Sequence, residues 1–242
     1  GLPLNDLRDA LFRHSKQRLV ILGDPGGGKT TTLRRLAMDL ARQRMVRPLQ
    51  PGSKLPFYVD LFEFREKDAD PEAFVRKKWQ EHCPLLDYDQ LRARGQVCFL
   101  LDGLNQMPVE DRGIRLDRWA TWAKSLSPGN WAIFTCRRAD YATGLGLPEV
   151  HVARLDEAAV RRYLVLRFGE DWTKQQWPDF ERQLRSGGDR FQRLVDNPFM
   201  LSLLVERLNK GQTLLVNRGQ LLCGMVDGRL EQDLLATCHG LV

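Results

Sequence analysis

One glycine-rich stretch, residues 23–30, constrains this chain more than any other part of its sequence. It reads Gly-Asp-Pro-Gly-Gly-Gly-Lys-Thr and matches G-x-x-x-x-G-K-T, the pattern of a phosphate-binding loop. The apolar run at 18–22 is typical of a buried parallel strand, and apolar residues recur at helical spacing over 33–41. A strand, a glycine loop and a helix in this order surround an anion with backbone N–H groups. The stretch therefore predicts a site for a nucleoside di- or triphosphate.

The residues of this loop have separate expected roles. Lys29 is expected to reach the β- and γ-phosphates, and the Thr30 hydroxyl is expected to bind Mg²⁺. Glycine lets the backbone approach phosphate oxygens and adopt positive φ values. The glycines expected to contact the nucleotide in this way are Gly23, Gly26, Gly27 and Gly28.

Asp102 is the second candidate residue for the site. Four apolar residues lead directly into it, and Gly103 follows. A protein with such a loop needs a second acid for Mg²⁺ at the end of a neighbouring strand. An aspartate in this position is also typical of a turn or a helix cap. Because the phosphate loop belongs to the same predicted sheet, we favour the metal role, with Thr30 and Asp102 as the two ligands.

Apolar runs alternate with helical patterns along the first part of the chain. This alternation predicts a parallel α/β sheet flanked by helices, with its ligand at the carboxyl ends of the strands. The helical patterns include a short one at 2–14, one that starts at Pro71, and one that carries Trp119, Trp122, Ala123 and Leu126 on one face. Besides 18–22, the predicted strands are 56–61, 97–102, 131–135 and 149–152, and a turn-rich connector lies at 47–52.

From residue 156 onward the pattern changes to helices without strands. Helical faces are predicted at 160–168, 201–208 and 221–226. We therefore expect two domains, a nucleotide-binding domain at 1–153 and a small all-α domain at 154–242. The predicted fold class is α/β, of the P-loop NTPase type, followed by this helical domain.

Composition narrows the possible classes of function. The formal charge is +6, but the basic residues are scattered along predicted helices, so a nucleic-acid partner is not indicated. Without a signal peptide or an apolar run long enough to cross a bilayer, we expect a cytoplasmic protein with no membrane partner. Cys98 and Cys136 lie in apolar strand-like runs and are expected as buried, reduced thiols. The dispersed histidines and cysteines argue against a zinc site.

Four patches in order resemble the NACHT family of signal-transducing ATPases, which belongs to the wider STAND and AAA+ groups. Residues 23–31 are similar to the family's phosphate loop, which adds Pro25 and Thr31 to the expected nucleotide contacts. Residues 100–104 are similar to its second motif, in which Asp-Gly follows the strand. The resemblance implies an AAA+-like sheet domain.

The two later patches add residues whose chemistry alone would not assign them to the nucleotide site. Residues 134–138 are similar to the family's sensor segment, in which an arginine follows a threonine at a strand end, and this implies that Arg137 contacts the γ-phosphate. Residues 197–201 are similar to an Asn-Pro-apolar stretch whose proline, here Pro198, packs against the adenine. Without the resemblance, an exposed arginine pair and an ordinary helix-start proline would be the simpler interpretations.

The chain departs from the family pattern just after Asp102. Members commonly carry two acids there, whereas this chain has the neutral amides Asn105 and Gln106. An amide cannot take a proton from an attacking water, although it can orient one. We therefore expect nucleotide binding with slow hydrolysis, and Lys29, Asp102, Asn105, Gln106 and Arg137 as the residues nearest to the chemistry.

The resemblance implies an ATP/ADP-dependent, Mg²⁺-dependent molecular switch. ADP would hold a closed monomer, ATP would favour an oligomer, and the effector and sensor modules would lie outside this segment, which starts at Gly1 instead of a methionine. Family members act in antiphage defence and innate immunity. Two alternatives remain open: a P-loop enzyme, such as a small-molecule kinase or a nucleic-acid-remodelling ATPase, and a catalytically silent nucleotide-binding scaffold.

Overall fold

The structure, a computed structural model, describes residues 17–46, 52–65, 70–108, 110–141, 144–186 and 188–209. The helices predicted at 2–14 and 221–226, and most of the connector predicted at 47–52, lie outside these ranges. The chain divides into two compact units, Gly1–Val152 and Ala153–Val242, and each is described by itself.

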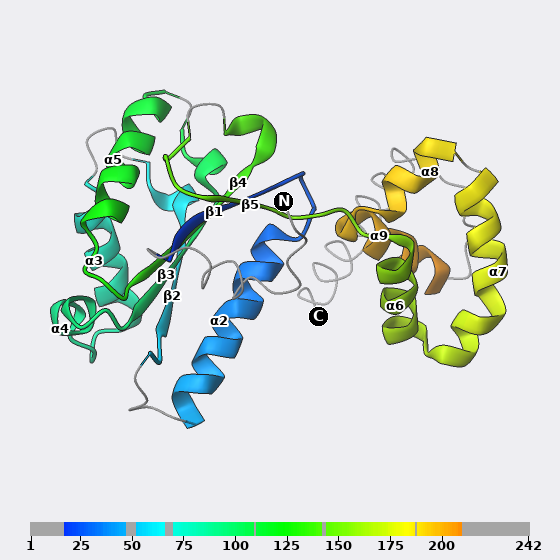
Figure 1. The fold of residues 1–242 in the computed structure, drawn as a ribbon, viewed down its shortest axis with the longest axis horizontal. Helices are drawn as coiled ribbons and strands as arrows, with labels where there is room; N and C mark the ends of the chain where they lie inside the picture. Colours follow the sequence, from blue (N-terminus) through cyan, green and yellow to red (C-terminus); the bar gives the residue numbers. More distant parts are fainter. Residues whose placement is uncertain are drawn as a thin grey trace, which may run out of the picture. The chain divides into compact units, whose positions relative to one another are not determined.

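The first unit is built on a five-stranded parallel sheet (Figure 1). Its strands are β1 (Arg18–Gly23), β2 (Leu55–Asp60), β3 (Val97–Asp102), β4 (Trp131–Arg137) and β5 (Glu149–His151). All five strand predictions are confirmed, each to within two residues of the observed ends. The spatial order is β2-β3-β4-β1-β5, so β4 lies between the strand before the glycine loop and the strand that ends at Asp102.

Helices cover both faces of this sheet (Figure 1). The helix after the glycine loop, α2 (Lys29–Val46), lies on one face, and α3 (Pro71–His82), α4 (Tyr88–Ala93) and α5 (Arg112–Ser125) lie on the other. The helix predicted from Pro71 is confirmed, whereas α4 was not predicted and Leu126 lies just past the end of α5. Short 3₁₀ turns directly follow three strands: η1 (Leu61–Glu63), η2 (Leu104–Gln106) and η3 (Arg138–Asp140).

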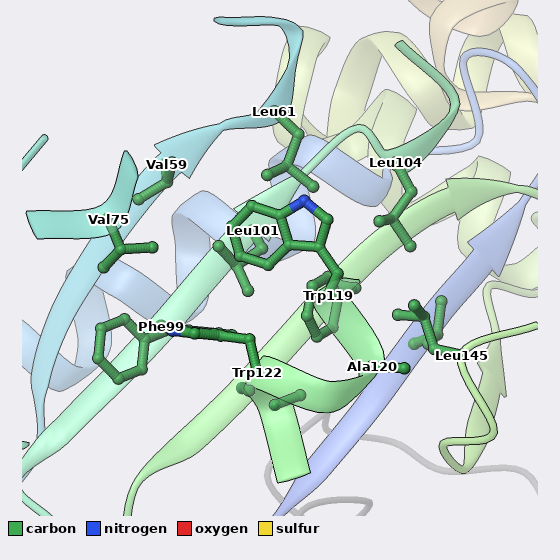
Figure 2. Close-up of a cluster of buried hydrophobic side chains, with 14 of the residues drawn as sticks. Val59, Leu61, Val75, Phe99, Leu101, Leu104, Trp119, Ala120, Trp122 and Leu145 are labelled. Atoms are coloured by element: carbon green, nitrogen blue, oxygen red, sulfur yellow. The ribbon is translucent and has the colours of Figure 1, made fainter. Parts of the chain in front are cut away.

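Side chains of each strand alternate between two apolar layers. Leu100 and Ile133 pack in the layer under α2, whereas Phe99 and Leu101 pack with α3 and α5. Figure 2 shows the second layer, in which the indole of Trp119 lies among the side chains of leucines. By the same alternation, Asp102 and Thr135, two positions beyond Leu100 and Ile133, lie on the side of the sheet that faces α2.

The described part of the second unit, residues 153–209, is helical and contains no strand. Its helices are α6 (Glu157–Phe168), α7 (Glu170–Ser186), α8 (Gly188–Val195) and α9 (Pro198–Asn209). The helical faces predicted at 160–168 and 201–208 lie on α6 and α9 and supply much of an apolar core. The helices α7 and α8 were not predicted. In α7, Pro178 would normally interrupt a helix, and few apolar positions mark its buried face.

Candidate functional site

The glycine loop joins β1 to α2 in a conformation that requires glycine. Gly26 and Gly28 have φ values of +74° and +92°, which L-residues with a Cβ rarely adopt. The Gly27 N–H donates to the Asp24 carbonyl at 3.0 Å, and a Cβ on Gly27 would lie only 3.0 Å from the same oxygen. The glycines predicted to shape the loop therefore have a steric reason to be there.

Lys29 brings positive charge to this loop. Its Nζ donates to the carbonyl oxygens of Gly23 and Asp24, each at 2.9 Å. Partial burial lowers the pKa of Lys29, and the nearby positive charge of Arg137 lowers it further. Arg137 is the register partner of Gly23, so β4 delivers a second cation beside the start of the loop. Two cations held together in this way favour a polyanionic ligand.

Asp102 lies at the centre of a group of hydroxyls. Its side chain is buried, and Oδ2 accepts hydrogen bonds from the Thr30 hydroxyl at 2.8 Å and the Tyr58 hydroxyl at 2.7 Å. Oδ1 accepts from the Thr135 hydroxyl, which in turn accepts from the Gly103 N–H at 2.8 Å. The fold thus brings Thr30 and Asp102 within one hydrogen bond of each other.

The oxygen donors of Thr30 and Asp102 fit a magnesium ion. Mg²⁺ prefers oxygen ligands and commonly binds through one or two protein groups together with substrate phosphates. No group of three or more His, Cys, Asp or Glu side chains that could hold a metal occurs among the described residues. A hydroxyl and a carboxylate beside a phosphate loop suit an ion that arrives with a nucleotide.

The amide pair lies on η2, directly after β3. Asn105 Oδ1 accepts a hydrogen bond from the Arg137 N–H at 3.1 Å, and its carbonyl accepts from the Arg112 guanidinium at 3.2 Å. Gln106 is exposed, and its side chain lies against Gly103, whose φ is +86°. Asn105 therefore ties the turn after β3 to the end of β4, and the catalytic role of both amides remains a prediction.

Pro198 begins α9 in the second unit. The preceding Asn197 caps the helix, because its Oδ1 accepts from the N–H groups of Phe199 at 3.1 Å and Met200 at 3.3 Å. A proline in the first turn of a capped helix has an ordinary structural role. Its contact with adenine, which the resemblance implied, remains a prediction.

Two polar residues of β2 were not predicted as part of this site. Tyr58 binds Asp102, and Asp60 is the register partner of Asp102 while its Oδ1 caps the Phe62 N–H at 2.9 Å. They lie two positions apart near a strand end, so alternation places both on one face. That signal was present in the sequence, but nothing local indicated that β2 is the neighbour of β3.

Two further predictions can be compared with the described residues. Cys98 and Cys136 are buried free thiols, as expected from their apolar surroundings. In the described ranges, no helix combines the length and the apolar character needed to cross a bilayer.

The fold and the loop define a P-loop NTPase. A family model described as the NACHT domain matches residues 17–171, which is more than half of the chain. The chain belongs to the NACHT family, so the family resemblance is confirmed. Membership of this group of STAND P-loop NTPases implies nucleotide binding.

Two solved structures are similar to this chain at low identity. Cdc6p from Pyrobaculum aerophilum has a TM-score of 0.41 and 16% identity, over 65% of this chain and 46% of its own. A Signal Transduction ATPase with Numerous Domains (STAND) with a tetratricopeptide repeat sensor, from Pyrococcus horikoshii, has a TM-score of 0.46 and 15% identity, over 83% of this chain and 29% of its own. This chain thus spans less than half the length of either protein. No curated protein matches it.

Proposed function

We propose that this chain is the nucleotide-dependent switch of a larger signalling ATPase. ADP holds a closed, monomeric state, and ATP favours an open state that self-associates. Nucleotide binding then shifts a conformational population and does not drive rapid turnover. Membership of the NACHT family and the geometry around Asp102 support this proposal.

The hydrogen bonds from Thr30 and Thr135 to Asp102 are the observation that most directly supports this proposal. One carboxylate binds Thr30, on the first turn of α2, and Thr135, on the strand that ends at Arg137. The gain or loss of a γ-phosphate at the loop would therefore affect the position of the end of β4 through these two hydrogen bonds. Arg137 is suited to detect a γ-phosphate, because a guanidinium can form two parallel hydrogen bonds to phosphate oxygens.

The proposed metal ion is Mg²⁺, held by Thr30 and Asp102. When bound, the ion neutralises charge on the β- and γ-phosphate oxygens. Lys29 binds the same phosphates as a point charge, and the loop N–H groups orient them. The nucleotide contacts proposed around these groups are Gly23, Pro25, Gly26, Gly27, Gly28, Thr31, Arg137 and Pro198.

Hydrolysis by this site is proposed to be slow. Asn105 and Gln106 stand where family members commonly carry acids, and general-base assistance of this kind is worth about 10²- to 10⁴-fold in rate. Asn105 Oδ1 is engaged by the backbone of Arg137, which suits a structural role better than proton transfer. Slow hydrolysis would prolong the ATP-bound state and hence the signal.

The wider role follows from the family alone. We propose a cytoplasmic protein whose effector and sensor modules lie outside residues 1–242, acting in a defence or innate-immunity pathway. The two units, separated near residue 153, are proposed to be the nucleotide-binding domain, 1–153, and a helical domain, 154–242.

Identifying the co-purified nucleotide tests this function. The protein is purified without added nucleotide and denatured, and the released compounds are separated by chromatography, with Lys29→Ala processed in parallel. Recovered ADP from the parent and none from the variant are expected. A nucleotide-free parent that phosphorylates a small acceptor would instead identify a kinase, and ATP turnover stimulated by nucleic acid would identify a remodelling ATPase.

A further inference from the structure

Tyr58 occupies a position between the metal-binding carboxylate and the helix that follows the glycine loop. Its hydroxyl donates to Asp102 Oδ2 at 2.7 Å, the same oxygen that accepts from Thr30. The guanidinium carbon of Arg34 lies 5.9 Å from the centroid of the Tyr58 ring. Arg34 is four residues after Thr30 on α2, so both residues belong to the same side of the helix.

The hydrogen bonds described for Asp102 come from the neutral hydroxyls of Thr30, Tyr58 and Thr135. An ionised carboxylate with hydroxyl donors has its orientation set by the directions of those hydrogen bonds. A phenol is ordinarily protonated at neutral pH, and Tyr58 is placed to donate its hydroxyl hydrogen to Asp102 Oδ2. Tyr58 is therefore a permanent donor to Oδ2.

We propose that Tyr58 is a positioning residue, which holds the Asp102 carboxylate in the orientation that metal-dependent nucleotide binding requires. This inference rests on the proposed function, because it concerns the same Mg²⁺-nucleotide site. Thr30 has two proposed tasks there, to bind the metal and to contact Asp102, whereas the Tyr58 hydroxyl, which comes from β2, donates to the same oxygen and has no proposed contact with the metal. Without the phenol, Thr30 and Thr135 still donate to the carboxylate, but its orientation is fixed less tightly.

Replacing the phenol alone tests this role. Tyr58→Phe keeps the ring that packs beside α2 and removes only the hydroxyl. Affinity for a fluorescent ATP analogue is measured by titration with Mg²⁺ and again with a chelator. We expect a loss of about 10- to 100-fold with Mg²⁺, the usual cost of removing a hydrogen bond that orients a metal ligand, and little change in chelator.

The matched control is Tyr88→Phe. Tyr88 begins α4 and donates from its phenol to a Glu72 carboxylate oxygen at 3.1 Å, so the same chemical group is lost from the same unit. Its side chain packs in the apolar layer of α3 and α5, not in the layer under α2. Affinity of this variant should match that of the parent in both conditions.

A double-mutant cycle separates positioning from general packing. In the Asp102→Asn background, Tyr58→Phe should cause no further loss of the Mg²⁺-dependent gain in affinity. The electron paramagnetic resonance signal of Mn²⁺ bound with ATP should broaden in Tyr58→Phe, because the carboxylate is less uniformly oriented. The positioning role would be overturned if Tyr58→Phe lost equal ATP affinity with Mg²⁺ and with chelator. It would also be overturned if Mg²⁺ raised the ATP affinity of Tyr58→Phe as much as it raises that of the parent.

Failure of the proposed function gives a different result. If the parent protein itself binds ATP equally well with and without Mg²⁺, the metal site and the function built on it are wrong. If the parent shows the Mg²⁺ gain and Tyr58→Phe shows the same gain, the proposed function stands and only the role of Tyr58 is wrong.

Discussion

Lys29 is the side chain on which the proposed nucleotide binding is expected to depend most directly. Its Nζ is bound to two loop carbonyls and is thus held where phosphates would lie. We expect Lys29→Ala to abolish detectable binding of fluorescent ATP, because the ammonium is the point charge for the phosphates. The circular dichroism spectrum should be unchanged, because it reports the helices and strands, which this substitution leaves in place. Lys77→Ala, an exposed position on α3, is the matched control. Undiminished affinity in Lys29→Ala would remove the site assignment.

Thr30 and Asp102 should affect binding through the metal ion. We expect Thr30→Ala and Asp102→Asn each to weaken ATP binding about 10- to 100-fold in Mg²⁺ and much less in chelator, because each removes one oxygen ligand or its charge. Asparagine retains an oxygen that can accept from Thr135, which limits the structural damage. Titration in the two buffers checks this, and equal losses in both would contradict the metal assignment.

The strands β2, β3 and β4 are each followed by a short 3₁₀ turn, and the turn after β3, η2, holds the amide pair Asn105 and Gln106. The turn η2 is tied at both sides, by Arg112 to the carbonyl of Asn105 and by the backbone of Arg137 to its side chain. An aspartate at 105 could accept the same hydrogen bond from the Arg137 N–H. The turn should therefore tolerate acids without changing its shape.

Acids introduced at positions 105 and 106 of η2 can therefore be tested for their effect on ATP hydrolysis. We expect the double variant Asn105→Asp, Gln106→Glu to raise single-turnover ATP hydrolysis by about 10- to 10⁴-fold, the upper part being the usual worth of a general base. Affinity for ATP should change little, because the loop and Asp102 are untouched. Single-turnover kinetics report chemistry before ADP leaves, so slow product release cannot hide the effect. A rate equal to that of the parent would mean that these side chains do not reach the water.

The buried thiols couple the stability of the whole sheet to alkaline pH. Burial raises the pKa of Cys136 from its ordinary value of 9.0 to about 11 and raises that of Cys98 as well. The folded state therefore binds the thiol protons more tightly than the unfolded chain does. The contribution of Cys136 to the free energy of unfolding is complete below pH 9 and is lost as the pH rises toward 11. Urea unfolding at a series of pH values should show this decline. Cys98→Ala with Cys136→Ala should flatten it, and an unaltered slope would assign it to other groups.

The chemistry of the loop and the identity of the strands were readable from the sequence. Strands buried on both faces of a parallel sheet appear as continuous apolar runs, as β1, β3 and β4 do, and the partly exposed edge strands β2 and β5 were recognised as well. The positions of Lys29 and Thr30 follow from spacing within one loop, where Gly26 and Gly28 supply the positive φ values. Such features depend on near neighbours in the chain. By contrast, α7 was missed because its interior Pro178 argues locally against the helix that tertiary packing stabilises.

Only the tertiary structure decided which strand ends meet. β4 follows β3 in the chain but lies between β1 and β3, and β2 lies on the other side of β3. This order brings the hydroxyls of Thr135 and Tyr58, 33 and 44 residues away in sequence, to the two oxygens of Asp102. Strand order depends on long-range pairing and on how helices cover the sheet, and no local pattern records it. The sequence determined which residues could bind a phosphate, and the fold decided which hydroxyls hold the carboxylate beside it.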